Sequence, residues 1–413
     1  MLTRRLAAQL VATTALSAAL GLPGRTVLAA DKVLKIGIDL SLTGADAESA
    51  SRIRNGIIMA VDDANKADTV KGYKIDLLTL DDGTATSGQY DPAQAATNAR
   101  KMVSDRDVVA AVGPQMSGAG KAMAPILSQG DLAIITPSST NPDITSPKFA
   151  EQYRPAGKPI YFRTVTTDAY QGPNMANFMA QKMGVRTAYV LDDSGAYGVG
   201  IADSFQAQAE KKGIKILGRD RLDPKAADYT AVLTKIKSLN PQAVYYGGVG
   251  QAGIKLAKQA YDIIPTVVKA GGDGVYGSSF LTGVGFPAAE GWYATIASPH
   301  LVNDKRAEEF VKTYSARFGV APEDYSITAY DATLVIIDAI KRVAASGKPV
   351  DRRSVRDAIQ SAKVQTIQGM VSFDENGDLA DRTVSVFQIM RDPKGQPDDV
   401  SAQYRYIDVA PQS

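Results

Sequence analysis

One stretch of the chain, Val112 to Thr140, restricts the possible folds more than any other. It predicts, in order, the end of an apolar strand at Ala110–Val112, a turn-rich loop, a helix over Gly120–Gln129, a second apolar strand over Leu132–Ile135 and a polar loop. Strands that alternate with helices pair in parallel, so the loops that follow them emerge together at the carboxyl edge of the sheet. This pattern predicts a parallel α/β sheet, and open sheets of this kind bind ligands at that edge.

The same alternation continues along the chain and divides it into two similar units. Three segments are expected to cross between the units: Tyr161–Val165, Trp292–Ser298 and Gln368–Phe373. We therefore expect an α/β protein with two Rossmann-like three-layer lobes joined by three crossings. Such crossings form a hinge, and the cleft between the lobes can close around a small ligand. The expected first lobe comprises residues 31–163 and 297–369, and the second comprises residues 164–296 and 370–413.

Residues 1–30 have the features of a secretory signal peptide. Arg4 and Arg5 form a positive start, Leu6–Leu22 is mostly apolar, and Val27-Leu28-Ala29 fits small-residue cleavage. A frayed N-terminal helix is the alternative. The chain has no cysteine, which excludes disulfides and a lipid-linked cysteine anchor. We therefore expect a periplasmic protein.

The charge balance gives no electrostatic reason to expect binding to nucleic acid or to a membrane surface. The net charge is +2, and the first thirty residues hold three arginines and no acidic residue, so their removal leaves +2 − 3 = −1.

Ser117 is expected just before the helix that starts at Gly120, where free backbone N–H groups and the helix dipole favour an anion. Ser138, Ser139 and Thr140 would face it from the next loop with hydroxyl and N–H donors. Helix capping and turn formation are the alternative roles for these residues. The arrangement suits a small carboxylate, and it contains no nucleophile–base pair.

Two glycine-rich segments have formal similarity to nucleotide-binding loops. Ser117–Ala122 is similar to a phosphate-binding loop, but Gln115 occupies the first glycine position and Ala122 replaces the hydroxyl that binds Mg²⁺. Gly248–Gly253 matches G-x-G-x-x-G after a strand, with Asp273 about twenty residues further on. Since nicotinamide cofactors are scarce outside the cytoplasm, we expect no bound cofactor.

The histidine and cysteine content argues against catalysis. The chain has one histidine, His300, and no cysteine, which excludes histidine-cluster metal sites and Cys–His catalysis. A Ser–His–Asp triad would have to use His300, which is far in sequence from every loop serine. Phe373–Leu379, FDENGDL, lacks the full spacing and terminal glutamate of a calcium loop. We expect no catalytic residues and no metal site, and a secreted hydrolase or oxidoreductase is the less favoured alternative.

Several short motifs carry a family resemblance when they are taken in order. They are KIGIDLSLTG, LTLDD, DPAQA, VGPQMS, IITPSST, YFRT, DDSGAYG, VYYGG, AGGDG and FDENGDL. In order and spacing they resemble the type I periplasmic binding proteins, specifically the leucine/isoleucine/valine-type solute-binding subunits of bacterial ABC importers. The resemblance covers nearly the whole chain after the expected signal peptide.

The resemblance implies roles for the head group of an amino-acid ligand. Ser117 and Thr140 match the residues that hold the ligand's α-carboxylate, and the Ser138 carbonyl matches the acceptor of the α-ammonium. Asp273 matches the acidic residue that pairs with the α-ammonium, although the family has glutamate there. Tyr197 matches a tyrosine of the second lobe.

The resemblance is weaker for the residues around the ligand's side chain. Tyr325 matches an aromatic residue of the family site, but Ser49 replaces a tyrosine and Val249 replaces an aromatic residue. We therefore expect an amino acid, branched-chain or similar with an aromatic one as a further option, delivered by a monomeric protein to ABC permease subunits in the membrane. The alternatives are a ligand sensor for a receptor and a protein that binds aromatic carboxylates lacking an amino group.

Overall fold

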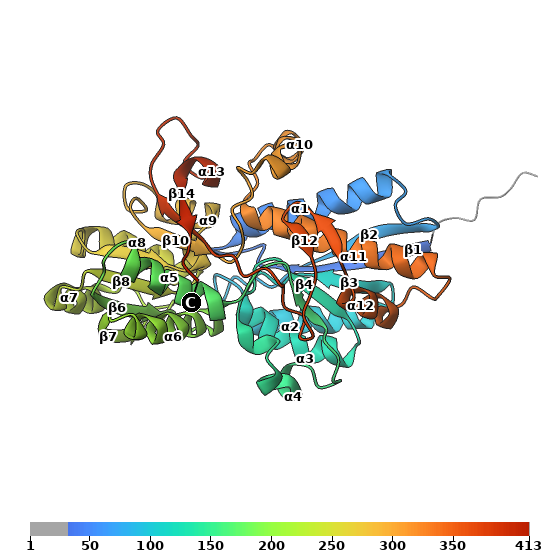
Figure 1. Cartoon of the computed structure of the whole chain (residues 1–413), viewed down its shortest axis with the longest axis horizontal. Helices are drawn as coiled ribbons and strands as arrows, with labels where there is room; N and C mark the ends of the chain where they lie inside the picture. Colours follow the sequence, from blue (N-terminus) through green and yellow to red (C-terminus); the bar gives the residue numbers. More distant parts are fainter. Residues whose placement is uncertain (1–31, 413) are drawn as a thin grey trace, which may run out of the picture.

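The computed structural model describes residues 32–412 and contains two large sheets side by side (Figure 1). The expected signal peptide lies outside the described residues. The first sheet has five parallel strands in the order β2-β1-β3-β4-β5. Its strands are β1 (Lys32–Leu40), β2 (Tyr73–Asp81), β3 (Val108–Val112), β4 (Ala133–Thr136) and β5 (Tyr161–Arg163).

Helices cover both faces of the first sheet. One face packs against α1 (Ala47–Lys66), α11 (Asp324–Ala345) and α12 (Arg352–Gln360), and the other against α2 (Pro92–Ser104) and α3 (Ser117–Gln129). Strand β3 shows why both layers form, because Val109 and Val112 pack into the first layer and Val108 and Ala111 into the second. A strand that is apolar on both faces must be covered on both.

The second sheet has seven strands in the order β14-β13-β10-β9-β8-β6-β7. Five of them run parallel, and β13 and β14 are antiparallel to their neighbours. The strands are β6 (Thr187–Asp192), β7 (Lys215–Arg221), β8 (Ala243–Gly247), β9 (Val268–Gly271), β10 (Tyr293–Ile296), β13 (Ser385–Ile389) and β14 (Tyr404–Val409). The helices of this unit are α5 (Asp168–Gln181), α6 (Ala196–Lys211), α7 (Thr230–Leu239), α8 (Gly250–Ile263) and α9 (Ser278–Val284).

The remaining elements are short or lie between the sheets. Helix α10 (Glu308–Phe318) precedes α11, and β11 (Val364–Thr366) with β12 (Gly369–Val371) forms a hairpin. The turns α4 (Ala150–Tyr153) and α13 (Val400–Gln403) complete the list of α-helices. The chain passes between the sheets after β5, after β10 and after β12, and no described helix is both long and apolar enough to span a membrane.

The predicted fold class is confirmed, and three local predictions need correction. Helix α3 begins at Ser117, three residues earlier than expected, so Ser117 is its first residue. Most of Trp292–Ser298 is strand β10 within the second sheet, because Ala294 and Ile296 alternate into its core. Likewise, half of Gln368–Phe373 is the hairpin strand β12, and the third passage follows it.

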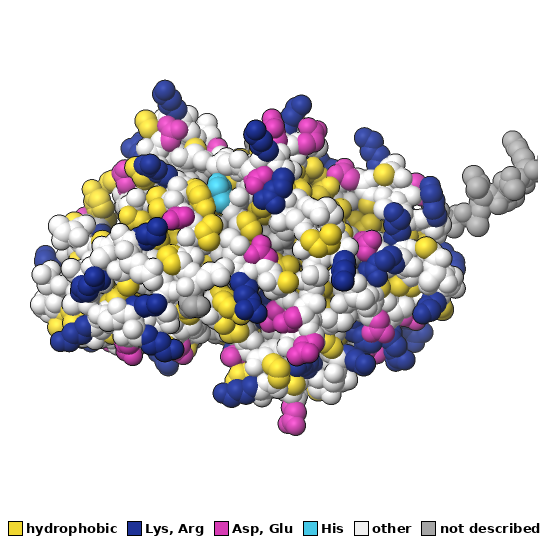
Figure 2. Space-filling model, in the orientation of Figure 1, with side chains coloured by type: hydrophobic (Ala, Val, Ile, Leu, Met, Phe, Trp, Pro, Cys, Tyr) yellow, Lys and Arg dark blue, Asp and Glu magenta, His cyan; other side chains and the backbone are white. Residues whose placement is uncertain are grey.

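The surface carries charges of both signs. In the view of Figure 2, lysine and arginine side chains are interspersed with aspartate and glutamate over both units. This pattern is typical of a solvated face.

Candidate ligand-binding site

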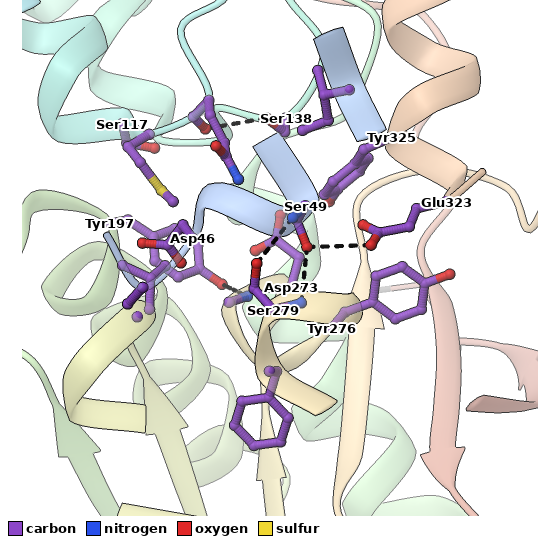
Figure 3. A pocket seen from close by; sticks show the side chains of 18 of the residues that line it. Asp46, Ser49, Ser117, Ser138, Tyr197, Asp273, Tyr276, Ser279, Glu323 and Tyr325 are labelled. Carbon is purple, nitrogen blue, oxygen red and sulfur yellow. Dashed lines mark hydrogen bonds between the residues drawn. The ribbon is translucent and has the colours of Figure 1, made fainter. Parts of the chain in front are cut away.

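A cavity of about 650 Å³, including its open mouth, lies where the two sheets face each other (Figure 3). Both units contribute to its wall. The first provides Ala45, Asp46, Ser49, Ile53, Gln115, Met116, Ser117, Ser138, Glu323 and Tyr325, and the second provides Tyr197, Val249, Gly250, Ile254, Asp273, Gly274, Tyr276, Ser279 and Phe280. Most of these residues follow the carboxyl ends of strands, as expected for ligand sites in open α/β sheets.

Ser117 forms a hydrogen-bond donor pole of the cavity. It is the first residue of α3 and is 2% exposed, so the unpaired N–H groups of that helix turn lie beside it. Its Oγ accepts hydrogen bonds from the Asn141 N–H at 3.2 Å and from the Ser139 hydroxyl at 3.3 Å. Because the oxygen already accepts twice, its own hydrogen is available to donate to a ligand in the cavity.

Ser138 contributes to the cavity wall, whereas Ser139 and Thr140 lie behind it. The Ser139 hydroxyl accepts a hydrogen bond from the Tyr161 hydroxyl at 2.8 Å and donates one to the Ser117 hydroxyl. Thr140 is fully buried, its hydroxyl has no partner, and its carbonyl accepts from the Asp168 N–H at 2.9 Å. Ser139 thus faces Ser117, as expected, but neither Ser139 nor Thr140 lines the cavity in this structure.

Arg163, the arginine of the YFRT motif, holds this loop in place, a role that the motif alone does not predict. It is completely buried and donates to the Ser139 carbonyl at 3.0 Å and the Asn141 carbonyl at 2.8 Å. Its Nε also pairs with Asp378 at 2.8 Å. One guanidinium therefore links the loop behind Ser117 to the third passage between the sheets.

Asp273 forms an acceptor pole on the opposite unit. It starts a short 3₁₀ turn after β9 and is 9% exposed, and its Oδ2 accepts from the Tyr325 hydroxyl at 2.6 Å. Burial raises the pKa of the Asp273 carboxyl, and hydrogen bonds such as that from Tyr325 oppose this rise. Tyr197 lies next to this turn, where its hydroxyl accepts from the Gly274 N–H at 3.2 Å.

A second buried carboxylate, Asp168, stands close to Asp273 and was not predicted. Its Oδ2 has no hydrogen-bond partner, and burial together with the charge of Asp273 raises its pKa well above the ordinary value. Gln171 bridges the two residues, because its amide donates to Asp168 at 3.0 Å and its carbonyl accepts from the Asp273 N–H at 3.0 Å. Two neighbouring carboxyl groups make this wall electrostatically favourable for a cation.

Hydrogen bonds between the units close the cavity on the side of α1. The Ser49 N–H donates to Ser279 Oγ at 2.9 Å (Figure 3). The Ser278 N–H donates to Glu323 at 2.8 Å. Burial raises the pKa of the Glu323 carboxyl, and the charge of Arg52, whose Nε lies 3.6 Å from Glu323 Oε1, opposes this rise. Ser49, where the resemblance would have a tyrosine, is thus part of this closing contact.

The charged side chains that line the cavity are all acidic in the described part of the chain: Asp46, Asp273 and Glu323. Burial, with the nearby charges of Asp82 and Asp193, raises the pKa of the Asp46 carboxyl to about 7. Asp46 was not singled out by sequence, because an aspartate before a helix ordinarily indicates only a helix cap. A cavity with serine donors on one wall and carboxylates on the others suits a ligand that carries both a negative and a positive group.

Comparison with known proteins agrees with this geometry. The model of the family described as "Periplasmic binding protein" matches residues 33–396. The chain is a periplasmic binding protein. It is 30% identical over 365 residues to the leucine-, isoleucine-, valine-, threonine-, and alanine-binding protein of Pseudomonas aeruginosa, covering 88% of this chain and 92% of that one. It is 29% identical over 356 residues to Leu/Ile/Val-binding protein homolog 3 of Brucella melitensis, covering 86% and 91% of the two chains.

The structure of this periplasmic binding protein is also similar to that of a leucine-binding protein from Thermotoga maritima. The TM-score is 0.77 at 25% identity, covering 91% of this chain and 98% of the other. The family model, the two relatives and the similar structure together assign the chain to the type I, leucine/isoleucine/valine-binding group. The members of this extracytoplasmic family are substrate-binding proteins and not enzymes.

Proposed function

We propose that this periplasmic binding protein is the substrate-binding subunit of an ABC importer and captures an amino acid in the cavity between its two units. The observation that carries the proposal is the separation of charge across the cavity. Ser117 offers donors from the first unit, and Asp273 offers a carboxylate from the second. An amino-acid head group has the complementary pair of charges.

The α-carboxylate would accept hydrogen bonds from the Ser117 hydroxyl and from the first N–H groups of α3. The α-ammonium would donate to Asp273 and to the Ser138 carbonyl. Within residues 32–412 no hydrogen bond reaches that carbonyl. Charge-assisted bonds in a buried site contribute about 1.5–3 kcal/mol each. An aromatic carboxylate without an amino group would leave the acidic wall unpaired, and this argues against that alternative.

Binding would also favour closure of the two units. The donor and acceptor poles lie on different units, so one ligand can bridge them only when the cavity is closed. A ligand shifts a conformational equilibrium when it binds one state more tightly. The closed form would then be the species that delivers the amino acid to membrane permease subunits. We expect the protein to act as a periplasmic monomer, and a sensing role would use the same site.

A thermal-shift screen of the protein from residue 31 onward tests the proposal. We expect α-amino acids to raise the melting temperature, because a ligand at a hundredfold excess over its Kd stabilises the folded state by about 2.7 kcal/mol. Matched carboxylic acids without the amino group should give little shift. Trp292 provides a second signal, because its ring packs 5.8 Å from that of Phe280, which lines the cavity. Stabilisation by deaminated acids alone would contradict the proposal.

Ser117→Ala is expected to weaken amino-acid binding by about tenfold, since it removes one hydroxyl donor and leaves the helix N–H groups in place. Isothermal titration calorimetry measures the change. Ser238→Ala, on an exposed site of α7, is the control and should leave the Kd unchanged. An unchanged Kd for Ser117→Ala would exclude this hydroxyl as a carboxylate donor.

A further inference from the structure

Asp46 lines the cavity without having a structural partner that accounts for its burial. It occupies the N-cap position of α1, but its side chain makes no capping hydrogen bond. The residue is 7% exposed, and its Oδ2 is buried with no hydrogen-bond partner. Burying a carboxylate without a hydrogen-bond partner costs desolvation free energy. A ligand that brings a hydrogen-bond donor to Asp46 would offset that cost.

A second unpaired oxygen faces the same place. A Cβ atom on Gly250, a residue of the cavity wall, would lie 2.8 Å from Gln89 Oε1 and 3.0 Å from Asp46 Oδ2, so both oxygens lie next to the same point of the wall. Gln89 Oε1 is also buried without a partner. The two oxygens are therefore at most about 6 Å apart, which one ammonium group can bridge with ordinary hydrogen bonds.

The surroundings of Asp46 favour a cation over a neutral donor. Two further carboxylates, Asp82 and Asp193, act on Asp46 electrostatically, and no basic side chain in residues 32–412 lines the cavity. The Asp193 carboxylate already accepts hydrogen bonds from the N–H groups of Gly195 and Val249, whereas the Asp46 carboxylate accepts no such backbone hydrogen bond. Figure 3 shows Asp46 beside Tyr197, on the same side of the cavity as Ser117, with Asp273 further to the right. The pocket thus has an acidic point besides the one that would hold an α-ammonium.

We propose that Asp46 and Gln89 bind a second ammonium group, so that the preferred ligand is a diamino acid whose side chain ends in a primary amine. The proposal rests on the amino-acid site described above, which would hold the head group of the same ligand. Apolar neighbours, Met116, Val249 and Ile254, line the cavity and can contact the methylene stem. The selectivity of this chain then differs from that of a pocket that accepts only aliphatic side chains.

Titration calorimetry with matched ligand pairs tests this assignment. L-2,4-diaminobutyrate is compared with L-norvaline, and L-ornithine with L-norleucine, because each pair differs only in a terminal ammonium or methyl group. We expect at least one diamino acid to bind tenfold to a hundredfold more tightly than its neutral partner, since one charge-assisted interaction is gained. Two ligand lengths are used because the stem must span the distance from the head group to Asp46.

Asp46→Asn identifies the residue that causes the preference. The ratio of the two Kd values within the favoured pair should fall at least tenfold in this variant. Asp63→Asn, an exposed carboxamide substitution on the same helix, should leave the ratio unchanged. A thermal melt of each variant checks folding. If norvaline or norleucine binds as tightly as its diamino partner, or Asp46→Asn leaves the ratio unchanged, the assignment is overturned while amino-acid binding stands. If no α-amino acid binds at all, the proposed function fails as well.

Discussion

Asp273→Ala is expected to reduce amino-acid affinity by about thirtyfold or more while the protein still folds. The substitution removes the carboxylate proposed to pair with the α-ammonium, and truncating one member of a buried charge pair costs about 2–5 kcal/mol of binding energy. Folding should persist because the neighbouring Asp168 carboxyl repels Asp273 in the unliganded protein. Calorimetry measures the affinity, and a thermal melt measures the stability.

Two companion variants sharpen the Asp273 experiment. Asp273→Asn keeps the shape and the Tyr325 hydrogen bond but removes the charge, so a loss similar to that of the alanine variant assigns the effect to charge. Asp262→Asn, on the exposed surface of α8, should bind as the unmodified protein does. Undiminished affinity in Asp273→Ala would refute the pairing of this carboxylate with the α-ammonium.

Arg163→Met is expected to lower the free energy of unfolding by about 3 kcal/mol, because each buried acceptor left without a donor costs about 1–3 kcal/mol. Besides losing its pair with Asp378, the variant leaves the Ser139 and Asn141 carbonyls without their guanidinium donor. The loop that supports Ser117 should loosen, so ligand affinity should fall too. Urea unfolding measures the stability, and calorimetry measures the affinity.

Arg317→Met provides the matched control for Arg163→Met. Arg317 also pairs with an aspartate, Asp62, but both side chains are largely exposed. Exposed pairs contribute about 0–1 kcal/mol, so the control should stay within that range. A loss below about 1 kcal/mol for Arg163→Met would mean that this guanidinium does not hold the loop in place.

The sequence predicted elements well where hydrophobic periodicity was strong. Strand β3 contains the expected Ala110–Val112, and α1 contains the helix that the spacing of Ile53, Ile57 and Val61 predicts over Arg52–Asn65. In both, the apolar residues repeat with the period of one element type. Helix α12 was missed, because its run of arginines and aspartate conceals three buried apolar positions. The β10 segment was placed in a crossing, because a four-residue strand next to a passage gives no separate sequence signal.

The sequence predicted the part of the candidate site that is formed by loops after parallel strands. Loops that follow parallel strands must meet at one edge, so Ser117, Ser138 and Asp273 could be expected near a ligand. Glu323, just before α11, belongs to no strand-end loop of that kind. Asp46 does lie in the loop after β1, but as the residue before α1 it cannot be told from an ordinary helix cap by sequence. Their importance depends on which polar atoms lack partners after folding, a property that no local pattern encodes.

The discontinuous make-up of both sheet units determines when the chain can fold. The layer that α1 begins on the first sheet is completed only by α11 and α12, and α11 starts about 160 residues after the last strand of that sheet. The second sheet ends with β14 at Tyr404–Val409. A chain that emerges with its N-terminus first therefore exposes apolar strand faces until nearly its last residues appear. Neither core can be completed early, so both units depend on the C-terminal part of the chain for their stability, and a chain truncated before α11 would leave apolar strand faces of both sheets uncovered.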